Sequence, residues 1–139
     1  MIDFSSQTDF DLTEVRKHGD WLTSVADSYD AMIESLGYVF CDDEYLHSLN
    51  VQHLDHDTLT DIITFDYGTE DVLEGELYIS IDRVRENAVE FGQEFEEELR
   101  RVMVHGILHM LGFGDHTKED KHKMRLLEDE NIKLFHVKQ

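Results

Sequence analysis

Proline, cysteine and long apolar runs are scarce or absent in this sequence, and the last two of these exclude classes of protein. There is no proline, and Cys41 is the single cysteine among 139 residues. A lone cysteine cannot form an internal disulfide, so we expect no disulfide partner and a reducing compartment, with Cys41 packed as a small hydrophobic side chain. No apolar run approaches the ~20 residues that span a bilayer, and residues 1–11 lack the features of a signal peptide. The sequence therefore predicts a cytoplasmic protein without membrane contact.

Positive charge is also scarce. Twelve lysine and arginine residues against 32 aspartate and glutamate residues give a net charge of −20. This is the opposite of the charge usual for a nucleic-acid-binding protein. After Arg16 and Lys17, the next basic residue is Arg83, and the others follow it. Any cationic contact with phosphate is therefore expected mostly from the C-terminal half.

Hydrophobic periodicity predicts strands and helices that form one domain over residues 1–139. The expected strands cover residues 1–5, 34–41, 60–67 and 73–81. The expected helices cover residues 13–29, 42–49, 82–91, 94–111 and 118–135. Asp42 or Asp43 is the expected N-cap of the second helix and Asp82 that of the third. This order predicts an α+β fold, an α/β sandwich with a mixed sheet of about four strands and five or so helices.

The stretch from His105 to His116 gathers metal-binding side chains on the fourth helix and just after it. His105 and His109 are four residues apart and lie beside an apolar stripe. The stripe consists of Leu99, Val102, Met103, Gly106, Ile107 and Met110. Side chains four apart stack one turn above the other, so two imidazoles can reach one ion at roughly 2.0–2.1 Å each. The spacing predicts a metal site at the end of this central helix.

A third metal ligand is expected beyond the helix. Gly112 suits the left-handed conformation that ends a helix, and Gly114 adds a second flexible point. Asp115 or His116 can then turn back toward the first two histidines. Three protein ligands and a water are the pattern of a catalytic zinc site, whereas structural sites have four ligands and usually include cysteine. Because no cysteine lies near, the residues alone predict a zinc hydrolase.

The run His-Gly-x-Leu-His-x-x-Gly-Phe, closing in Asp-His, resembles the signature of the YbeY family, bacterial zinc-dependent endoribonucleases of ribosomal RNA maturation. Leu49-Asn50, residues 60–65 and residues 74–79 resemble the family in order and spacing. The resemblance implies the fold above and one zinc ion per chain. It also implies a single-strand-specific, metal-dependent endoribonuclease in late small-subunit rRNA 3′-end processing and ribosome quality. RNA and the small ribosomal subunit are the implied partners.

The spacing of the third ligand departs from the family pattern. The family's His-x3-His-x5-His places this ligand at Asp115, whereas the histidine, His116, comes one residue later. Imidazole is the better zinc ligand in a set of histidines, so we expect His105, His109 and His116 to act through the metal-bound water. Asp115 would then hold a ligand imidazole, although it is also the alternative third ligand. Glu76 or Asp115 could assist as a base.

Other residues bear on substrate binding. The resemblance implies that Thr64 lines a groove leading to the zinc, although its hydroxyl could equally bond to the strand backbone. The family's phosphate-contacting arginine corresponds to Leu54, and His53 or His56 could partly substitute. The family's Phe-Pro is replaced here by Phe65-Asp66, which we expect to be a local change.

Two other functions remain compatible with these residues. A zinc metallopeptidase or amidase would need a base from elsewhere, since Gly106 stands where His-Glu-x-x-His peptidases have their glutamate. A non-catalytic ribosome-assembly factor would use zinc only to brace its fold. His105 and His109 could also be a core pair without metal. Most of the remaining histidines are expected at the surface: His18, His47, His53, His56, His122 and His136.

Overall fold

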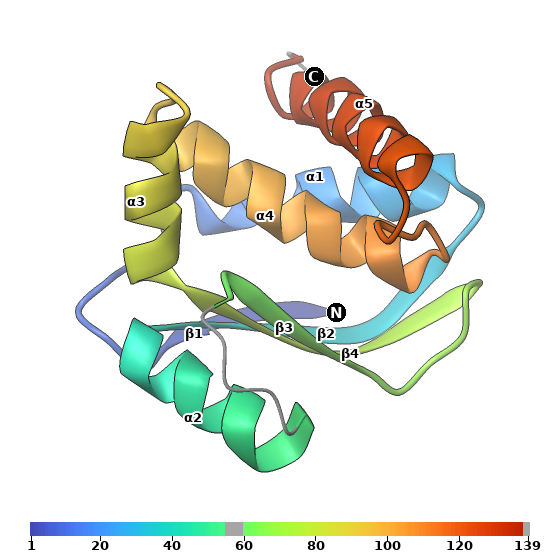
Figure 1. Ribbon diagram of the computed structural model, residues 1–139. Coiled ribbons are helices and arrows are strands. Elements are labelled where there is room, and N and C mark those ends of the chain that lie inside the picture. The colour runs from blue at the N-terminus through green and yellow to red at the C-terminus, as the bar shows by residue number, and fades with distance from the viewer. Residues whose placement is uncertain (55–59, 138–139) are drawn as a thin grey trace.

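The computed structural model describes residues 1–54 and 60–137, and its elements follow the predicted order (Figure 1). The strands in this part of the chain are β1 (Ile2–Ser6), β2 (Met32–Cys41), β3 (Ile62–Asp66) and β4 (Val72–Ser80). The helices are α1 (Val15–Ser28), α2 (Asp43–Leu54), α3 (Ile81–Glu90), α4 (Phe95–Met110) and α5 (Lys118–Phe135). None of these helices is long and apolar enough to cross a membrane.

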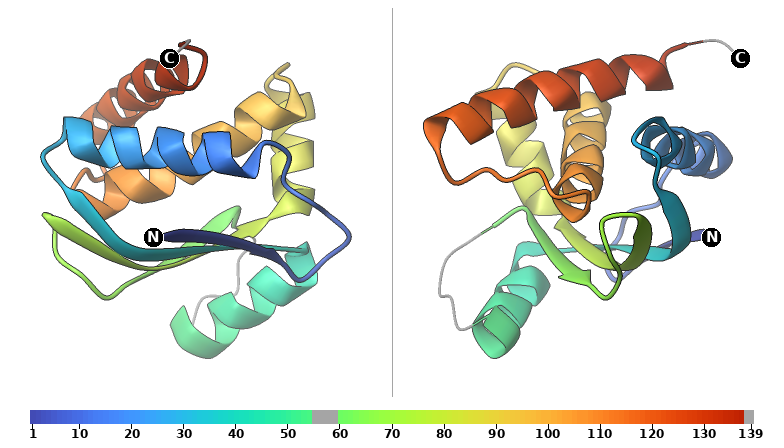
Figure 2. Two further views of the ribbon diagram at one scale, coloured as in Figure 1. Left: turned by 180° about the vertical axis from the view of Figure 1, so that it is seen from behind. Right: turned by 90° about the vertical axis from the view of Figure 1, so that its right-hand side faces the viewer.

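The strands form one sheet in the order β1-β2-β4-β3. β1, β2 and β4 are parallel, and β3 is antiparallel to β4. Helices α1, α3, α4 and α5 cover one face of the sheet, whereas α2 lies on the other face (Figures 1 and 2). The predicted α+β fold with a mixed sheet of about four strands is confirmed.

The main core lies between the sheet and the helices that cover it. Tyr38, Leu77 and Ile79 face this core from β2 and β4, and each is completely buried. The predicted stripe of α4 packs against them, because side chains three and four apart share one face of a helix. Its apolar side chains are at most 3% exposed: Leu99, Val102, Met103, Ile107 and Met110.

Cys41 belongs to a smaller apolar cluster under α2, with Leu46 and Ile63. Its thiol is completely buried and lies 3.5 Å from the carbonyl oxygen of Ile79. Burial raises the pKa of the Cys41 thiol to about 12. The expectation that Cys41 packs as a small hydrophobic side chain is therefore confirmed.

Side-chain bonds fix where two of the helices begin. The carboxylate of Asp42 accepts the amide hydrogen of Tyr45 (2.8 Å), as expected for the N-cap of α2. The prediction for α3 is wrong, because Ser80 is its N-cap and its hydroxyl accepts a first-turn amide hydrogen (3.2 Å). Asp82 instead accepts the amide hydrogen of Asp43 (2.9 Å) and so ties α3 to α2.

Two further sequence expectations differ from the structure. Helix α2 continues to Leu54, past the predicted end at residue 49, because no glycine or proline interrupts it. His18 was expected at the surface with most histidines, but its side chain is only 2% exposed. The ring bonds through Nδ1 to the carbonyl oxygen of Glu14 (3.0 Å) and packs 4.8 Å from the Phe135 ring. Burial lowers the pKa of His18.

Candidate active-site pocket

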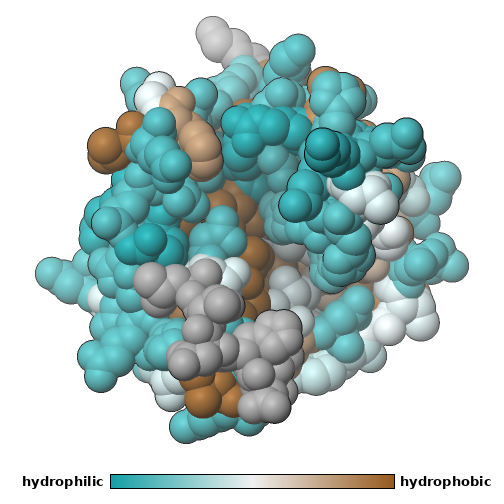
Figure 3. Space-filling view, viewed as in Figure 1, coloured by the Kyte–Doolittle hydropathy of each residue, from teal (hydrophilic) through white to brown (hydrophobic). Residues whose placement is uncertain are grey.

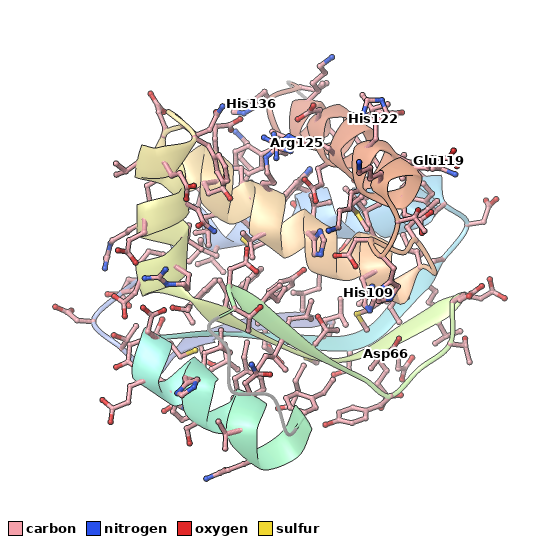
Figure 4. All side chains as sticks on the ribbon, viewed as in Figure 1. Asp66, His109, Glu119, His122, Arg125 and His136 are labelled. Carbon is pink, nitrogen blue, oxygen red and sulfur yellow. The ribbon has the colours of Figure 1, made fainter. Side chains whose placement is uncertain are left out.

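A pocket of about 310 Å³ opens between α4 and the residues that lead into and form β3. Its lining consists of Thr60, Asp61, Ile62, Ile63, Thr64, His105, His109 and Asp115. The two histidines predicted to act together therefore face the same space, and Thr64 faces it from β3. Figure 4 shows His109 near the end of α4, above the sheet. The face seen in Figure 3 is mostly hydrophilic, with hydrophobic residues visible in a hollow near its middle.

Gly106 sets the distance between α4 and the sheet. A Cβ atom there would lie 2.3 Å from Cδ2 of Leu77 and 3.0 Å from Cδ1 of Ile62. A side chain at this position would push the helix away from the sheet. The position therefore points at side chains of β3 and β4. A glutamate here, as in the peptidase motif, could not be accommodated in this packing.

Helix α4 ends in a Schellman motif that turns the chain back toward the pocket. The amide hydrogen of Gly112 is donated to the carbonyl oxygen of His109 (3.0 Å), and that of Phe113 to Leu108 (3.1 Å). Gly112 has a φ of 104°, so the predicted role of a glycine at this helix end is confirmed. After the turn, Oδ2 of Asp115 lies 3.5 Å from Nε2 of His105.

His105 is held by α5 on the side of its ring away from Asp115. Its Nδ1 lies 2.8 Å from Oε2 of Glu128. Arg101 donates to Oε1 of Glu128 (3.0 Å) and to Asp129 (2.6 Å). The side chains of Glu128 and Arg101 are only 8% and 15% exposed. The hydrogen bond to Glu128 raises the pKa of His105, although burial of the ring opposes this.

The pocket is negatively charged. Burial raises the pKa of Asp61, while the charge of His105 acts in the opposite direction. Asp61 and Asp115 both line the pocket with the two histidines, and no lysine or arginine is among the lining residues that the structure describes. Such a lining attracts a cation, and it repels a phosphodiester unless a cation is also bound.

Glu76 lies away from this pocket, which corrects its predicted role there. Side chains alternate along β4, so Glu76 points to the opposite face of the sheet from Leu77, which packs against α4. Its carboxylate accepts hydrogen bonds from the hydroxyls of Tyr67 (3.3 Å) and Tyr78 (3.1 Å). In this structure Glu76 does not line the pocket.

The two candidates for the third ligand are placed differently. Asp115 lines the pocket, whereas the side chain of His116 is exposed and is not part of the lining. Within the described part of the chain, no three histidine, cysteine, aspartate or glutamate side chains are arranged closely enough to hold a metal ion. The side chains of His105, His109 and Asp115 would have to converge further around an ion.

The predicted substrate contacts next to β3 are only partly described. The side chain of Leu54, at the position of the family's arginine, lies outside the described residues, as do those of His53 and His56. Asp66, labelled in Figure 4, ends β3 and accepts the amide hydrogen of Gly68 (3.0 Å). The replacement of the family's proline by Asp66 is therefore a local change within a turn.

Sequence reasoning missed Asp61 and Glu128. Asp61 lies within residues 60–65, which resemble the family, but the sequence pattern alone assigns its acidic side chain no role. Glu128 falls between Met124 and Ile132 on the buried side of α5. The position of Glu128 on the buried side of the helix is a signal that could have been used. A buried carboxylate needs a partner, so Glu128 was a candidate for contact with another polar residue.

A larger cavity of about 580 Å³ lies between α1 and the end of α5. It is lined by the aromatic rings of Trp21 and Phe135 and by the cations Arg16 and Lys17. The ammonium group of Lys17 lies 4.3 Å from the centre of the Phe135 ring. This cavity contains none of the residues of the metal-binding motif, so the candidate active site is the smaller pocket.

Comparisons with known proteins identify the family and agree with the fold. The family model described as Endoribonuclease YbeY matches residues 2–136. Endoribonuclease YbeY of Flavobacterium psychrophilum is 50% identical over 139 residues, which cover 100% of this chain and 99% of that protein. Endoribonuclease YbeY of Bacteroides thetaiotaomicron is 41% identical over 119 residues, or 86% of this chain and 87% of that protein. The solution structure of TM1509 from Thermotoga maritima superposes with a TM-score of 0.69 at 25% identity, covering 97% of this chain and 89% of that one.

Together the fold and the pocket define a small α+β protein whose candidate site lies between a central helix and an edge strand, and the family match makes it a hydrolase. The extent of the match to the family model and the identity to relatives over nearly whole chains decide which hydrolase this is. The chain belongs to the YbeY family of endoribonucleases.

Proposed function

We propose that the pocket is the active site of a metal-dependent endoribonuclease that processes ribosomal RNA. Membership of the YbeY family supports endoribonuclease activity. The observation that carries the proposal is a pair of histidines one helical turn apart, facing carboxylates in a pocket whose described lining has no cationic side chain. A phosphodiester is an anion, so the positive charge that binds it must come from a bound cation.

His105, His109 and Asp115 would hold a zinc ion in this pocket. Two imidazoles and one carboxylate are a ligand set found in catalytic zinc sites. Asp115 is proposed in place of His116, because Asp115 lines the pocket and lies 3.5 Å from His105, whereas His116 is exposed. A zinc ion bound there supplies positive charge and a Lewis acid beside the phosphodiester.

Other side chains of the pocket would handle the substrate and its protons. The hydroxyl of Thr64 can donate a hydrogen bond to a phosphate oxygen from β3. The carboxylate of Asp61, whose pKa burial raises, can accept a proton from the attacking water. Glu128 holds Nδ1 of His105, so that Nε2 faces the pocket.

The proposed substrate is single-stranded ribosomal RNA, cut late in the 3′-end maturation of the small subunit and therefore in the cytoplasm. The name shared by the relatives supports RNA as the substrate class. The ribosomal role and the small subunit as partner follow from the resemblance of the sequence segments to the YbeY family.

The proposal is tested by cleavage of a single-stranded RNA before and after chelation of the metal. A duplex RNA of the same sequence and a peptide are assayed separately as alternative substrates. His109→Ala should lower chelator-sensitive RNA cleavage by at least about 100-fold, because a zinc ligand is lost. The variant should keep its circular dichroism and thermal midpoint. His122→Ala, which changes an exposed histidine of α5, is the matched control and should cleave normally.

Other outcomes of this experiment would support the alternative functions. Chelator-sensitive cleavage of the peptide and not of the RNA would indicate a peptidase or amidase. A structural zinc in an assembly factor would give a different pattern. The unmodified chain would not cleave RNA, and His109→Ala would lose both its bound metal and its thermal stability.

A further inference from the structure

The contact between α4 and α5 suggests a role for a carboxylate outside the pocket. The two helices pack together (Figures 1 and 2). Glu128 projects from α5 to His105, 23 residues earlier in the chain, and its Oε2 lies 2.8 Å from Nδ1 of the ring. Glu128 does not line the pocket. Its hydrogen bond to a lining residue of the pocket is the one with His105.

A hydrogen bond at one ring nitrogen of histidine decides what the other nitrogen can do. A neutral imidazole has one N–H and one lone pair. An ionised carboxylate can only accept, so Glu128 requires a proton on Nδ1 of a neutral His105. The lone pair is then on Nε2, the nitrogen that faces Asp115 across 3.5 Å. Only this tautomer can offer Nε2 to a metal ion.

Arg101 fixes the orientation of Glu128. It comes from the same helix as His105, four residues earlier, and donates to Oε1 of Glu128 at 3.0 Å. Its other terminal nitrogen donates to Asp129 at 2.6 Å. Because the Glu128 side chain is 8% exposed and the Arg101 side chain 15%, water competes little with the first of these bonds. Oε1 of Glu128 thus bonds to Arg101, and Oε2 bonds to His105.

We propose that Glu128, oriented by Arg101, is a positioning residue that fixes the tautomer of His105 and thereby prepares Nε2 for metal binding. This inference rests on the proposed metal site. It makes α5 part of the active site, although none of its residues lines the pocket as the structure describes it. Partners of this kind typically contribute about 10–100-fold to metal affinity.

Glu128→Gln is the most direct test, because glutamine has the same shape and keeps the packing of α5. Arg101 needs an acceptor, so the amide oxygen of the glutamine will face Arg101 and its NH2 group will face Nδ1 of His105. That arrangement forces the proton to Nε2 and removes the lone pair from the pocket. The expected result is about 10–100-fold weaker zinc binding in competition with a chromophoric chelator, with an unchanged thermal midpoint of the metal-free protein.

A second variant separates orientation from packing. In Glu128→Gln combined with Arg101→Met, the amide is free to rotate and present its oxygen to Nδ1. Zinc affinity should therefore recover part of the loss seen with Glu128→Gln alone. Asp129→Asn is the matched control, because it changes only the half-exposed partner of Arg101, and it should leave zinc affinity unchanged.

The tautomer itself can be observed by nitrogen-15 NMR of histidine-labelled, metal-free protein, well above the pKa of imidazole. The unmodified chain should show His105 with its proton on Nδ1, and Glu128→Gln should show it on Nε2. A proton on Nε2 in the unmodified chain, or zinc affinity in Glu128→Gln within threefold of the original, would overturn the inference. If the unmodified chain binds no zinc at all, the proposed metal site is wrong. The NMR result still decides whether Glu128 fixes the tautomer of His105.

Discussion

The side chains around His105 decide which metal ligands are available. Asp115 approaches one ring nitrogen and Glu128 the other, while the next residue along the chain, His116, is exposed. Asp115 thus lines the pocket, whereas the sequence favours the imidazole of His116 as the third ligand. The helix ends in a turn at Gly112, and Asp115 reaches the pocket three residues later.

Substitutions at Asp115 and His116 distinguish the two candidate ligands. Asp115→Asn should weaken zinc binding by at least about tenfold, because an amide is a poorer zinc ligand than a carboxylate. His116→Ala should leave both zinc binding and RNA cleavage close to those of the unmodified chain. Zinc content after dialysis and a chelator competition measure both. The reverse pattern would establish His116 as the ligand.

His18 gives a prediction about pH that is independent of the pocket. Burial lowers its pKa in the folded state below the ordinary value of 6.5. The unfolded chain therefore binds a proton more readily, and stability falls as the pH drops below about 6.5. This loss should be smaller in His18→Gln and unchanged in His122→Gln, an exposed control. Urea unfolding at several pH values tests it, and an identical pH dependence in all three chains would contradict it.

Helix α4 and the sheet depend on each other through one glycine. The close approach at Gly106 leaves no space for a Cβ atom, and the neighbouring Leu77 is completely buried. The same approach brings His105 and His109 beside β3, so that helix and strand together form the pocket. Close packing against the sheet therefore favours glycine after the first histidine.

Gly106→Ala should destabilise the protein by about 1–2 kcal/mol, because overpacking outweighs the gain in helix propensity. Gly37→Ala is the control, since a Cβ atom there meets no atom within 4 Å, and it should change stability by less than about 0.5 kcal/mol. Thermal and urea unfolding measure both. Equal stability of the two variants would show that α4 can shift without cost.

The charge of the whole molecule limits how it can bind RNA. A net charge of −20 and a pocket whose described lining has no lysine or arginine leave few cations for phosphate contacts. Several of the arginines are already paired with carboxylates, among them Arg83, Arg100 and Arg101. Affinity for RNA must therefore come largely from the pocket and from whatever partner presents the RNA.

Binding of free RNA should accordingly be weak and only slightly dependent on salt. Each phosphate contact with a single strand contributes about −0.7 to the slope of log K against log salt concentration. We expect a slope well short of −4 in a titration of the zinc-loaded, unmodified chain with a single-stranded RNA that cannot be cleaved. A slope of about −4 or steeper would indicate six or more contacts and a cationic surface that remains to be found.

Much of the fold could be predicted from patterns among residues that are close together in the sequence. The apolar stripe of α4, the strands of the mixed sheet and the role of Gly112 depend on local periodicity and backbone conformation. The sequence prediction for the N-cap of α3 was wrong, because Ser80 and Asp82 are both residue types that favour this position. Only the tertiary contact of Asp82 with Asp43 decides that Ser80 is the cap. His18 was misjudged because burial depends on the distant Phe135.

The amino-acid sequence on its own determined that His105 and His109 share one side of a helix, since the geometry of a helix fixes the relation between residues four apart. Only the folded chain decided what surrounds them. Asp61 arrives from the residue just before β3 and Glu128 from α5, while Glu76 is turned to the far face of the sheet. Such placements depend on how elements distant in sequence pack together, and no local spacing encodes them.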